Sequence, residues 1–168
     1  MAGVMDADDP ERFAYLAEGN AKQARKRVAA DVLILDQAGR VLLVDPTYKP
    51  DWDMPGGMAE ANERPSAAAE RELREELGLE LSVGRLLYLE WAPPHGPWDD
   101  TLMFVFDGGT LSDASIAALR TTDDELRTFA FVSVDEARGR LRPYVWQRLR
   151  QAVTARETGE TIYVEPES

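Results

Sequence analysis

Three glutamates near the middle of the chain, Glu72, Glu75 and Glu76, stand at spacings of three, four and one residues. If this segment is helical, the rotation of about 100° per residue places all three carboxylates within one ~100° arc of the helix. Like charges at these spacings destabilise a helix by roughly 0.2–0.5 kcal/mol per pair. A solvated acidic face laced with arginines tolerates that cost, whereas a hard cation such as Mg²⁺, Mn²⁺ or Ca²⁺ removes it. The spacing by itself leaves both interpretations open.

The local sequence predicts the helix that the glutamates need. A helix is expected over residues 65–77, because the segment starts with proline, continues through three alanines and is followed by Gly78. The rest of the chain alternates between the two element types, which predicts one mixed α/β domain. Strands are expected at 28–35, 40–44, 81–91, 101–106 and 128–134, and further helices at 10–26, 113–119 and 143–157.

Composition excludes several classes of protein. The 168 residues favour a single domain. There is no cysteine and His95 is the only histidine, which excludes a disulfide scaffold, a zinc-thiolate site and a multi-histidine metal site. A net charge of −12 opposes binding to nucleic acid. No apolar run approaches the ~20 residues of a membrane helix, and the N-terminus lacks a secretory pattern. We therefore expect a cytoplasmic protein with no membrane partner.

The residues around the three glutamates complete a longer pattern. Residues 57–79, GMAEANERPSAAAERELREELGL, fit Gly-x5-Glu-x7-Arg-Glu-apolar-x-Glu-Glu-x-Gly-apolar at every fixed position. A chance match in a chain of this length is on the order of 10⁻⁷ or rarer. The segment resembles the Nudix box, and with the WDMPGG lead-in the resemblance to the Nudix hydrolase family spans most of residues 27–142. Arg64 departs from the pattern, because a small capping residue often precedes the proline.

The resemblance implies a Nudix-type α/β/α sandwich around a mixed β-sheet. We expect a helical extension, residues 1–26, packed on a Nudix hydrolase domain, residues 27–168. The resemblance also implies a bound Mg²⁺, with Mn²⁺ as the alternative, and a structural ion pair between Glu63 and Arg71. The implied metal ligands are Glu72, Glu75, Glu76 and the carbonyl of Gly56.

Catalysis also needs a group that takes the proton of the attacking water. Glu75 and Glu76 are candidates within the box, and many family members carry an acid on a loop further along the chain. The acidic stretch 123–125 precedes a predicted strand, and Glu125 is the preferred candidate there. The alternative for this stretch is a turn with solvated carboxylates.

Substrate contacts are expected from two aromatic loops. The loop WAPPHGPWDD (91–100) combines three prolines with two tryptophans, so it offers a stiff wall and flat faces. The candidate substrate-binding residues are Tyr48, Trp52, Trp91, Pro94 and Trp98, with packing in the core or at its rim as the alternative. Pro94 lies fifteen residues after Leu79, a spacing that in the family hints at ADP-ribose-type substrates. His95 is expected to be a surface residue.

The resemblance implies hydrolysis of the diphosphate bond in a nucleoside diphosphate linked to another group, with ADP-ribose or nucleotide sugars favoured. A pyrophosphohydrolase of nucleoside triphosphates is the main alternative. A non-catalytic nucleotide-binding module of the same fold is another, although such modules usually have eroded boxes. An isopentenyl diphosphate isomerase is disfavoured, because its commonest form uses a cysteine. Family analogy also suggests a homodimer.

Overall fold

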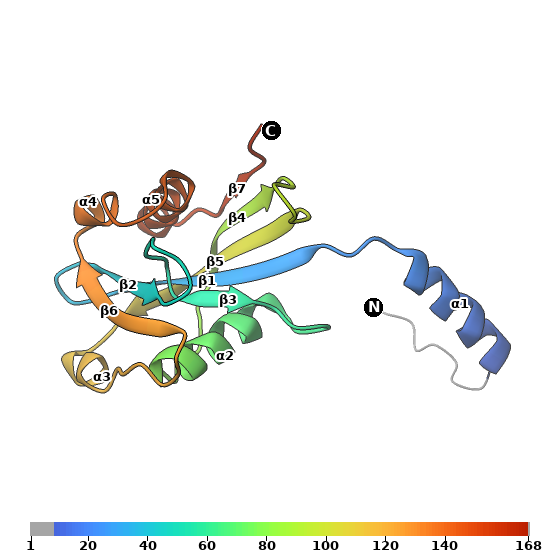
Figure 1. The fold of residues 1–168 in the computed structure, drawn as a ribbon, viewed down its shortest axis with the longest axis horizontal. Helices are drawn as coiled ribbons and strands as arrows, with labels where there is room; N and C mark the ends of the chain where they lie inside the picture. Colours follow the sequence, from blue (N-terminus) through green and yellow to red (C-terminus); the bar gives the residue numbers. More distant parts are fainter. Residues whose placement is uncertain (1–8, 168) are drawn as a thin grey trace.

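The computed structural model describes residues 9–167, which form a seven-stranded mixed sheet with helices on both faces (Figure 1). The helices are α1 (Pro10–Lys22), α2 (Pro65–Leu77), α3 (Asp113–Ala117), α4 (Val134–Ala137) and α5 (Pro143–Thr158). The strands are β1 (Arg27–Leu35), β2 (Val41–Pro46), β3 (Gly56–Met58), β4 (Leu86–Ala92), β5 (Thr101–Thr110), β6 (Leu126–Val132) and β7 (Ile162–Val164).

The sheet is centred on β1. Its strand order is β6-β2-β1-β5-β4-β7, and β3 also pairs with β1. β1 runs parallel to β5 and antiparallel to β2 and β3, so the sheet is mixed as expected. The two-stranded hairpin predicted around residues 36–39 is present, and the Asp36 carboxylate accepts hydrogen bonds from the backbone N–H groups of Ala38 and Arg40. This side-chain cap orders the turn that joins β1 to β2.

Helices cover the two faces of the sheet, which confirms the predicted sandwich. Alternate residues of β1 enter two different apolar clusters, because successive side chains of a strand point to opposite faces. Val32 belongs to the cluster that contains Leu73 and Leu77 of α2, whereas Leu33 belongs to the cluster that contains Leu149 of α5. Figure 1 shows α2 and α3 on one side of the sheet and α4 and α5 on the other.

Helix α2 has the bounds that its sequence predicts, Pro65–Leu77. Gly78 adopts the left-handed conformation, with φ 64°, and its N–H bonds to the carbonyls of Arg74 and Leu73. Leu73 and Leu77 are fully buried against the sheet, and burial of each contributes about 1.5–3 kcal/mol. The apolar face of α2 therefore fixes which of its carboxylates turn toward the sheet.

Other elements differ from their predicted bounds. The strand expected from residue 81 begins only at Leu86, because the Val83 N–H donates to the Glu70 carboxylate and the Gly84 N–H donates to the Asp107 carbonyl. These contacts hold residues 81–85 as a loop. The sequence analysis also missed β3, α4 and β7, which are three or four residues long and carry too few residues for a periodic pattern.

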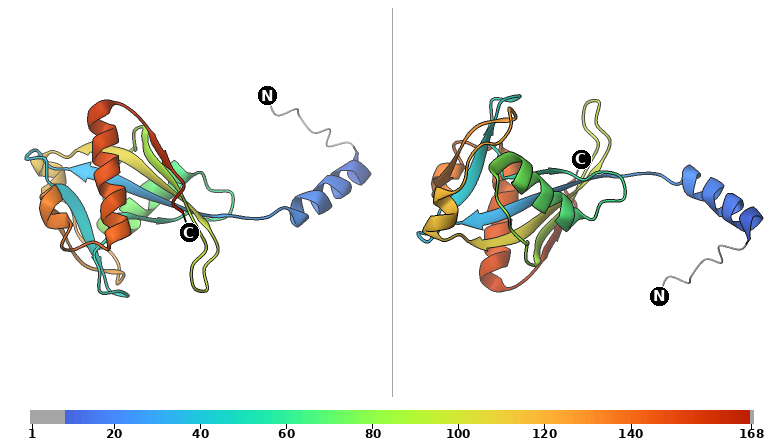
Figure 2. Two further views of the ribbon diagram at one scale, coloured as in Figure 1. Left: turned by 90° about the horizontal axis from the view of Figure 1, so that it is seen from above. Right: turned by 90° about the horizontal axis from the view of Figure 1, so that it is seen from below.

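The N-terminal helix differs most from expectation. α1 ends at Lys22 rather than 26, and none of its residues is buried. Figures 1 and 2 show it standing away from the sheet and the other helices, with residues 23–26 leading into β1. The structure thus does not show the expected packing on the domain, because the apolar side chains of α1 contact no core. Residues 1–8 of the expected extension lie outside the described residues.

Within residues 9–167, no helix combines the length and the apolar character that crossing a lipid bilayer requires.

Candidate active site

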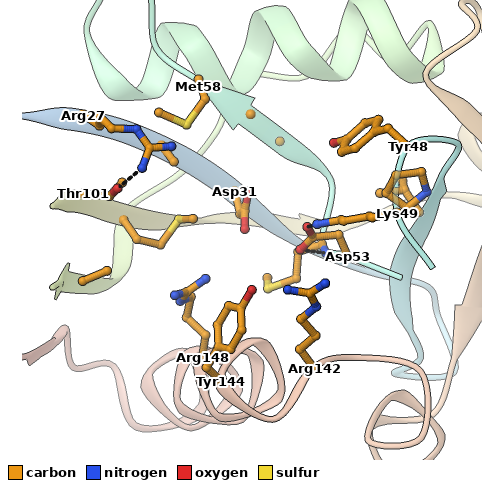
Figure 3. Close-up of a pocket in the computed structure, with 18 of the residues that line it drawn as sticks. Arg27, Asp31, Tyr48, Lys49, Asp53, Met58, Thr101, Arg142, Tyr144 and Arg148 are labelled. Atoms are coloured by element: carbon orange, nitrogen blue, oxygen red, sulfur yellow. Dashed lines mark hydrogen bonds and ion pairs between the residues drawn. The ribbon is translucent and has the colours of Figure 1, made fainter. Parts of the chain in front are cut away.

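A cavity of about 460 Å³ lies between the β1–β3 region of the sheet and helix α5 (Figure 3). Gly57 and Glu76 of the box line one side, together with Gly56, which directly precedes it. Figure 3 shows Tyr144 and Arg148 of α5, and Arg142 directly before this helix, reaching toward the cavity. Side chains that come more than sixty residues after the box in the sequence therefore face it across the cavity.

Two glycines allow the box to approach β1 closely. Gly56 has φ 144°, and a Cβ there would lie 2.2 Å from the carbonyl oxygen of Ala30. A Cβ on Gly57 would lie 2.5 Å from the carboxylate carbon of Glu72. A side chain at Gly56 would force the backbones of β3 and β1 apart, and a side chain at Gly57 would displace the Glu72 carboxylate. The glycines thus let the backbone at 56–57 pass directly against the Glu72 carboxylate.

Arg71 connects the loop of the box to its helix. Its Nε and one terminal nitrogen each donate to Glu63 at 2.9 Å, and the same terminal nitrogen donates to the Met58 carbonyl at 3.0 Å. The other terminal nitrogen lies 3.1 Å from both Glu72 and Glu75. The bidentate pair of hydrogen bonds from Arg71 lowers the pKa of the Glu63 carboxyl group to about 2. The ion pair expected between Glu63 and Arg71 is therefore present in the structure.

We expect Glu63→Gln to lower the melting temperature at pH 7, with a difference from wild type that shrinks at low pH. The pKa of Glu63 is lower in the folded than in the unfolded protein, so its stabilisation is complete above about pH 4.5 and is lost as the pH falls toward 2. Thermal unfolding of the metal-free proteins between pH 3 and 7 measures this. A Glu60→Gln variant is the control, because that exposed side chain makes no such contact. A difference that stays constant down to pH 3 would contradict the ion-pair role.

The three glutamates of the box have different surroundings. Glu75 is 54% exposed and contacts Arg71, and Glu72 is 14% exposed and contacts Arg71 as well. Glu76 is buried, and its Oε2 has no hydrogen-bond partner. In the described part of the chain no three carboxylate or imidazole groups converge tightly enough to hold a metal ion in these rotamers. Glu76 nonetheless supplies a buried, unpartnered oxygen beside Glu72, which suits a hard divalent cation.

The pKa of Glu76 is raised to about 8. Burial is the largest cause, and the negative charges of four neighbours add to it: Glu72, Glu125, Asp123 and Asp31. An ionised Glu76 is thus costly at neutral pH unless a cation lies beside it. The pKa of Glu72 is raised too, chiefly by burial. The fold accordingly holds these carboxylates in a place that favours a positive charge.

In the absence of metal, we expect the melting temperature to fall as the pH rises from about 4.5 to about 8, because of the ionisation of Glu76. The pKa of this group is higher in the folded than in the unfolded protein, so its stabilising contribution is complete below about pH 4.5 and is lost as the pH rises through 8. Glu76→Gln should remove this part of the decline, as thermal unfolding in EDTA would show. Glu60→Gln should keep it. The assignment would be wrong if the pH profile of Glu76→Gln matched that of wild type.

Glu125 lies at the turn before β6. Its backbone carbonyl accepts a hydrogen bond from the Thr47 N–H at 2.8 Å, which ties this turn to the loop after β2. Its charge helps to raise the pKa of both Glu72 and Glu76. The carboxylate is therefore near the box, as a candidate proton acceptor must be.

The cavity includes only some of the aromatic candidates. Tyr48 and Trp98 line it, and they are 70% and 54% exposed. Trp52 instead packs against the apolar cluster that contains Leu149 of α5. The guanidinium carbon of Arg140 lies 4.6 Å from the centre of the Trp52 ring. Trp91 donates from Nε1 to Asp100 at 2.7 Å. Neither of these tryptophans contributes to the cavity lining, and neither does Pro94, whereas His95 does.

Sequence reasoning missed Arg148, a charged residue on the side of the cavity that α5 forms. Arg148 is 6% exposed, and it donates to the buried carboxylate of Glu90 at 2.8 Å. The Tyr88 hydroxyl also donates to Glu90, at 2.7 Å. A signal was present, because Arg148 shares the helical spacing of Val145, Leu149 and Ala152 and so falls on the buried face of α5.

Asp31 was missed as well. It is 6% exposed, the other residues from 28 to 35 are all apolar, and it stands opposite Gly56 in the β1–β3 register. Figure 3 shows it near the centre of the cavity, between the box side and α5. A lone acid within the apolar run AADVLIL is the signal that could have identified it.

The model of the NUDIX domain family matches residues 25–155, and the chain belongs to this family. Diphosphoinositol polyphosphate phosphohydrolase 2 of Rattus norvegicus is 44% identical over 64 residues, which are 38% of this chain and 36% of that protein. The matched segment thus spans about a third of this curated relative.

Two solved structures illustrate the shared fold. A UDP-X diphosphatase structure gives a TM-score of 0.71 at 18% identity, over 94% of this chain and 75% of that one. An ADP-ribose pyrophosphatase from Streptococcus suis gives 0.60 at 16% identity, over 84% of this chain and all of the other. At these identities the comparison shows the fold alone.

Proposed function

We propose that this chain is a divalent-metal-dependent hydrolase that cleaves the diphosphate bond of a nucleoside diphosphate linked to another group. The observation that carries the proposal is the buried, unpartnered Oε2 of Glu76, whose side chain lies beside Glu72 at the edge of the cavity. A helix that holds such a carboxylate without a partner gives up stability, which a bound cation restores. The intact Nudix box around Glu76 supports the same conclusion.

We assign metal binding and proton transfer to different residues of the chain. Glu72, Glu76 and Glu75, with the Gly56 carbonyl, would hold Mg²⁺ or Mn²⁺, which neutralises diphosphate oxygens and makes bound water more acidic. Glu125 would take the proton of the attacking water. The water oxygen joins phosphorus, the bridging P–O bond breaks, and a nucleoside monophosphate and a second phosphate ester leave.

A nucleotide sugar or an ADP-ribose-type conjugate is the favoured substrate. The exposed rings of Tyr48 and Trp98 at the cavity offer faces for a base or a sugar. Two structural neighbours are named for UDP-X and ADP-ribose, which agrees with this class. A nucleoside triphosphate would bring more negative charge to a protein whose net charge is −12. A cytoplasmic location and a homodimer belong to the same proposal.

A second candidate is the hydrolysis of diphosphoinositol polyphosphates. It is favoured by the 44% identity over 64 residues to a phosphohydrolase of that name. Four lysine and arginine side chains also line the cavity, and such side chains bind clustered phosphates.

A product-resolved screen separates these functions. Purified protein with Mg²⁺ or Mn²⁺ is incubated with ADP-ribose, UDP-glucose, a diphosphoinositol polyphosphate and a nucleoside triphosphate. The proposal expects a nucleoside monophosphate and a sugar phosphate from the conjugates. Release of pyrophosphate from the triphosphate with a higher kcat/KM than for every conjugate would overturn it. Orthophosphate release from the inositol compound alone would select the second candidate.

A further inference from the structure

One face of β1 runs along the cavity and joins two chemically different ends. Arg27, Ala29 and Asp31 are alternate residues of this strand, and all three line the cavity. Asp31 stands opposite Gly56, which directly precedes the box, whereas Arg27 stands opposite Thr101 at the start of β5. Four residues of strand separate the two Cα atoms by roughly 13 Å. The cavity thus has an inner end at the box and an outer end at Arg27 (Figure 3).

Arg27 differs from the other cations of the cavity. In the described residues no carboxylate oxygen lies within 4 Å of its guanidinium, whereas the remaining lysine and arginine side chains that line the cavity each have such a partner. The three pairs are Lys49–Asp53, Arg142–Asp51 and Arg148–Glu90. The positive charge at the outer end is therefore not compensated by a direct ion pair within residues 9–167.

Neutral groups hold the Arg27 side chain in place. One terminal nitrogen donates to the Thr101 hydroxyl at 3.0 Å and to the Asp99 carbonyl at 3.3 Å. The guanidinium carbon lies 4.8 Å from the centre of the Trp98 ring. Its Nε and second terminal nitrogen donate to no acceptor in the described residues. Two neighbouring N–H donors on one guanidinium edge match the two oxygens of a carboxylate or a phosphate.

The stretch between the two ends is apolar. Ala29 pairs with Met58 of β3 on one side and with Met103 of β5 on the other, and all three residues line the cavity. This floor offers no hydrogen-bonding side chain to a ligand that lies across it. It suits the sugar or ring portion of a substrate whose two ends are both charged.

We infer that the outer end of the cavity binds a second anionic group of the substrate, a carboxylate or a phosphate monoester, through Arg27. This inference rests on the proposed function, which assigns the scissile diphosphate to the inner end. It goes further by stating that the preferred diphosphate conjugate carries an additional negative charge away from the diphosphate. Trp98 orients the guanidinium that selects this charge.

Two matched pairs of compounds test the inference. UDP-glucuronate differs from UDP-glucose by a carboxylate in place of a hydroxymethyl group, and coenzyme A differs from dephospho-coenzyme A by one phosphate monoester. The first pair places the extra charge on the sugar side of the diphosphate, and the second places it on the nucleoside side. KM and kcat with Mg²⁺ are measured for all four, together with calorimetric binding in EDTA.

The matched variants are Arg27→Gln and Lys26→Gln. Both remove one positive charge from adjacent positions, but Lys26 pairs with Asp100 and does not line the cavity. Wild type should prefer the anionic member of at least one pair by about tenfold or more in KM or in binding. Arg27→Gln should abolish this preference in KM and in binding, and Lys26→Gln should retain it. Arg27→Lys should restore part of it.

Three outcomes would overturn the inference. They are equal or undetectable binding of both members of both pairs, a preference that survives in Arg27→Gln, and an equal loss in Lys26→Gln. Failure of the proposed function has a different result, namely no cleavage of any of the four compounds with Mg²⁺ or Mn²⁺. The binding preference in EDTA still tests Arg27 in that case. Melting temperatures of the variants confirm that each is folded.

Discussion

Replacing Glu76 with glutamine is expected to lower kcat for a diphosphate substrate by at least ~10²-fold, which corresponds to about 2.7 kcal/mol of transition-state stabilisation. Glutamine keeps the size of the side chain but removes the charge that a divalent cation requires. Glu72→Gln should have an effect of similar size. The reason is structural, because Glu76 is buried with an unpartnered oxygen and Glu72 lies directly against the Gly57 backbone. Steady-state kinetics with saturating Mg²⁺ measure the change.

Glu60→Gln is the matched control for these variants. Glu60 lies in the same loop–helix segment, its side chain is exposed, and it contacts Glu63 through its backbone N–H and carbonyl. The variant removes the same charge and should leave kcat nearly unchanged. The assignment of the box would be wrong if Glu60 mattered as much as Glu76. Metal-free Glu76→Gln should also be more stable than wild type at pH 8, so loss of activity would not reflect loss of folding.

Chelation with EDTA is expected to abolish the activity, and Mg²⁺ or Mn²⁺ should restore it. The same cations should raise the melting temperature, because they bind the folded site and not the unfolded chain. At a hundredfold excess over Kd the linkage gives about 2.7 kcal/mol, or roughly 5–10 °C for a domain of this size. Activity assays and thermal unfolding with and without metal measure the two effects.

The double variant Glu72→Gln/Glu76→Gln should lose the metal-induced shift in melting temperature. A shift that persists in this variant would place the binding elsewhere in the protein. Full activity after exhaustive chelation would refute the role of the metal. Together the two readouts separate binding of the cation from its use in hydrolysis.

Local signals decided the elements that carry the box. Pro65, the alanines that follow it and Gly78 act within a few residues of their own positions, and α2 has the predicted bounds. The apolar runs on either side of Asp36 likewise predicted the hairpin of β1 and β2. Propensity, capping and turn chemistry are short-range effects, so a sequence is sufficient to predict them.

Spacing could not distinguish the members of the glutamate cluster. Glu75 and Glu76 are neighbours in the same box, yet one is largely exposed and the other is buried. The difference arises because Leu73 and Leu77 turn one face of α2 toward the sheet. The two tryptophans of the loop 91–100 pose the same problem, because pairing between His95 and Trp98 helps determine which ring reaches the cavity.

The sequence alone determined the family pattern, the fold class and the helix of the box, because these depend on residues close together in the chain. The tertiary structure determined which residues form the α5 side of the cavity and its outer end. Arg148 and Glu90 are 58 positions apart in the sequence, and Arg27 and Thr101 are 74 positions apart. Such contacts form only when α5 packs on the sheet and β1 pairs with β5. Long-range packing therefore determined the charge distribution of the cavity.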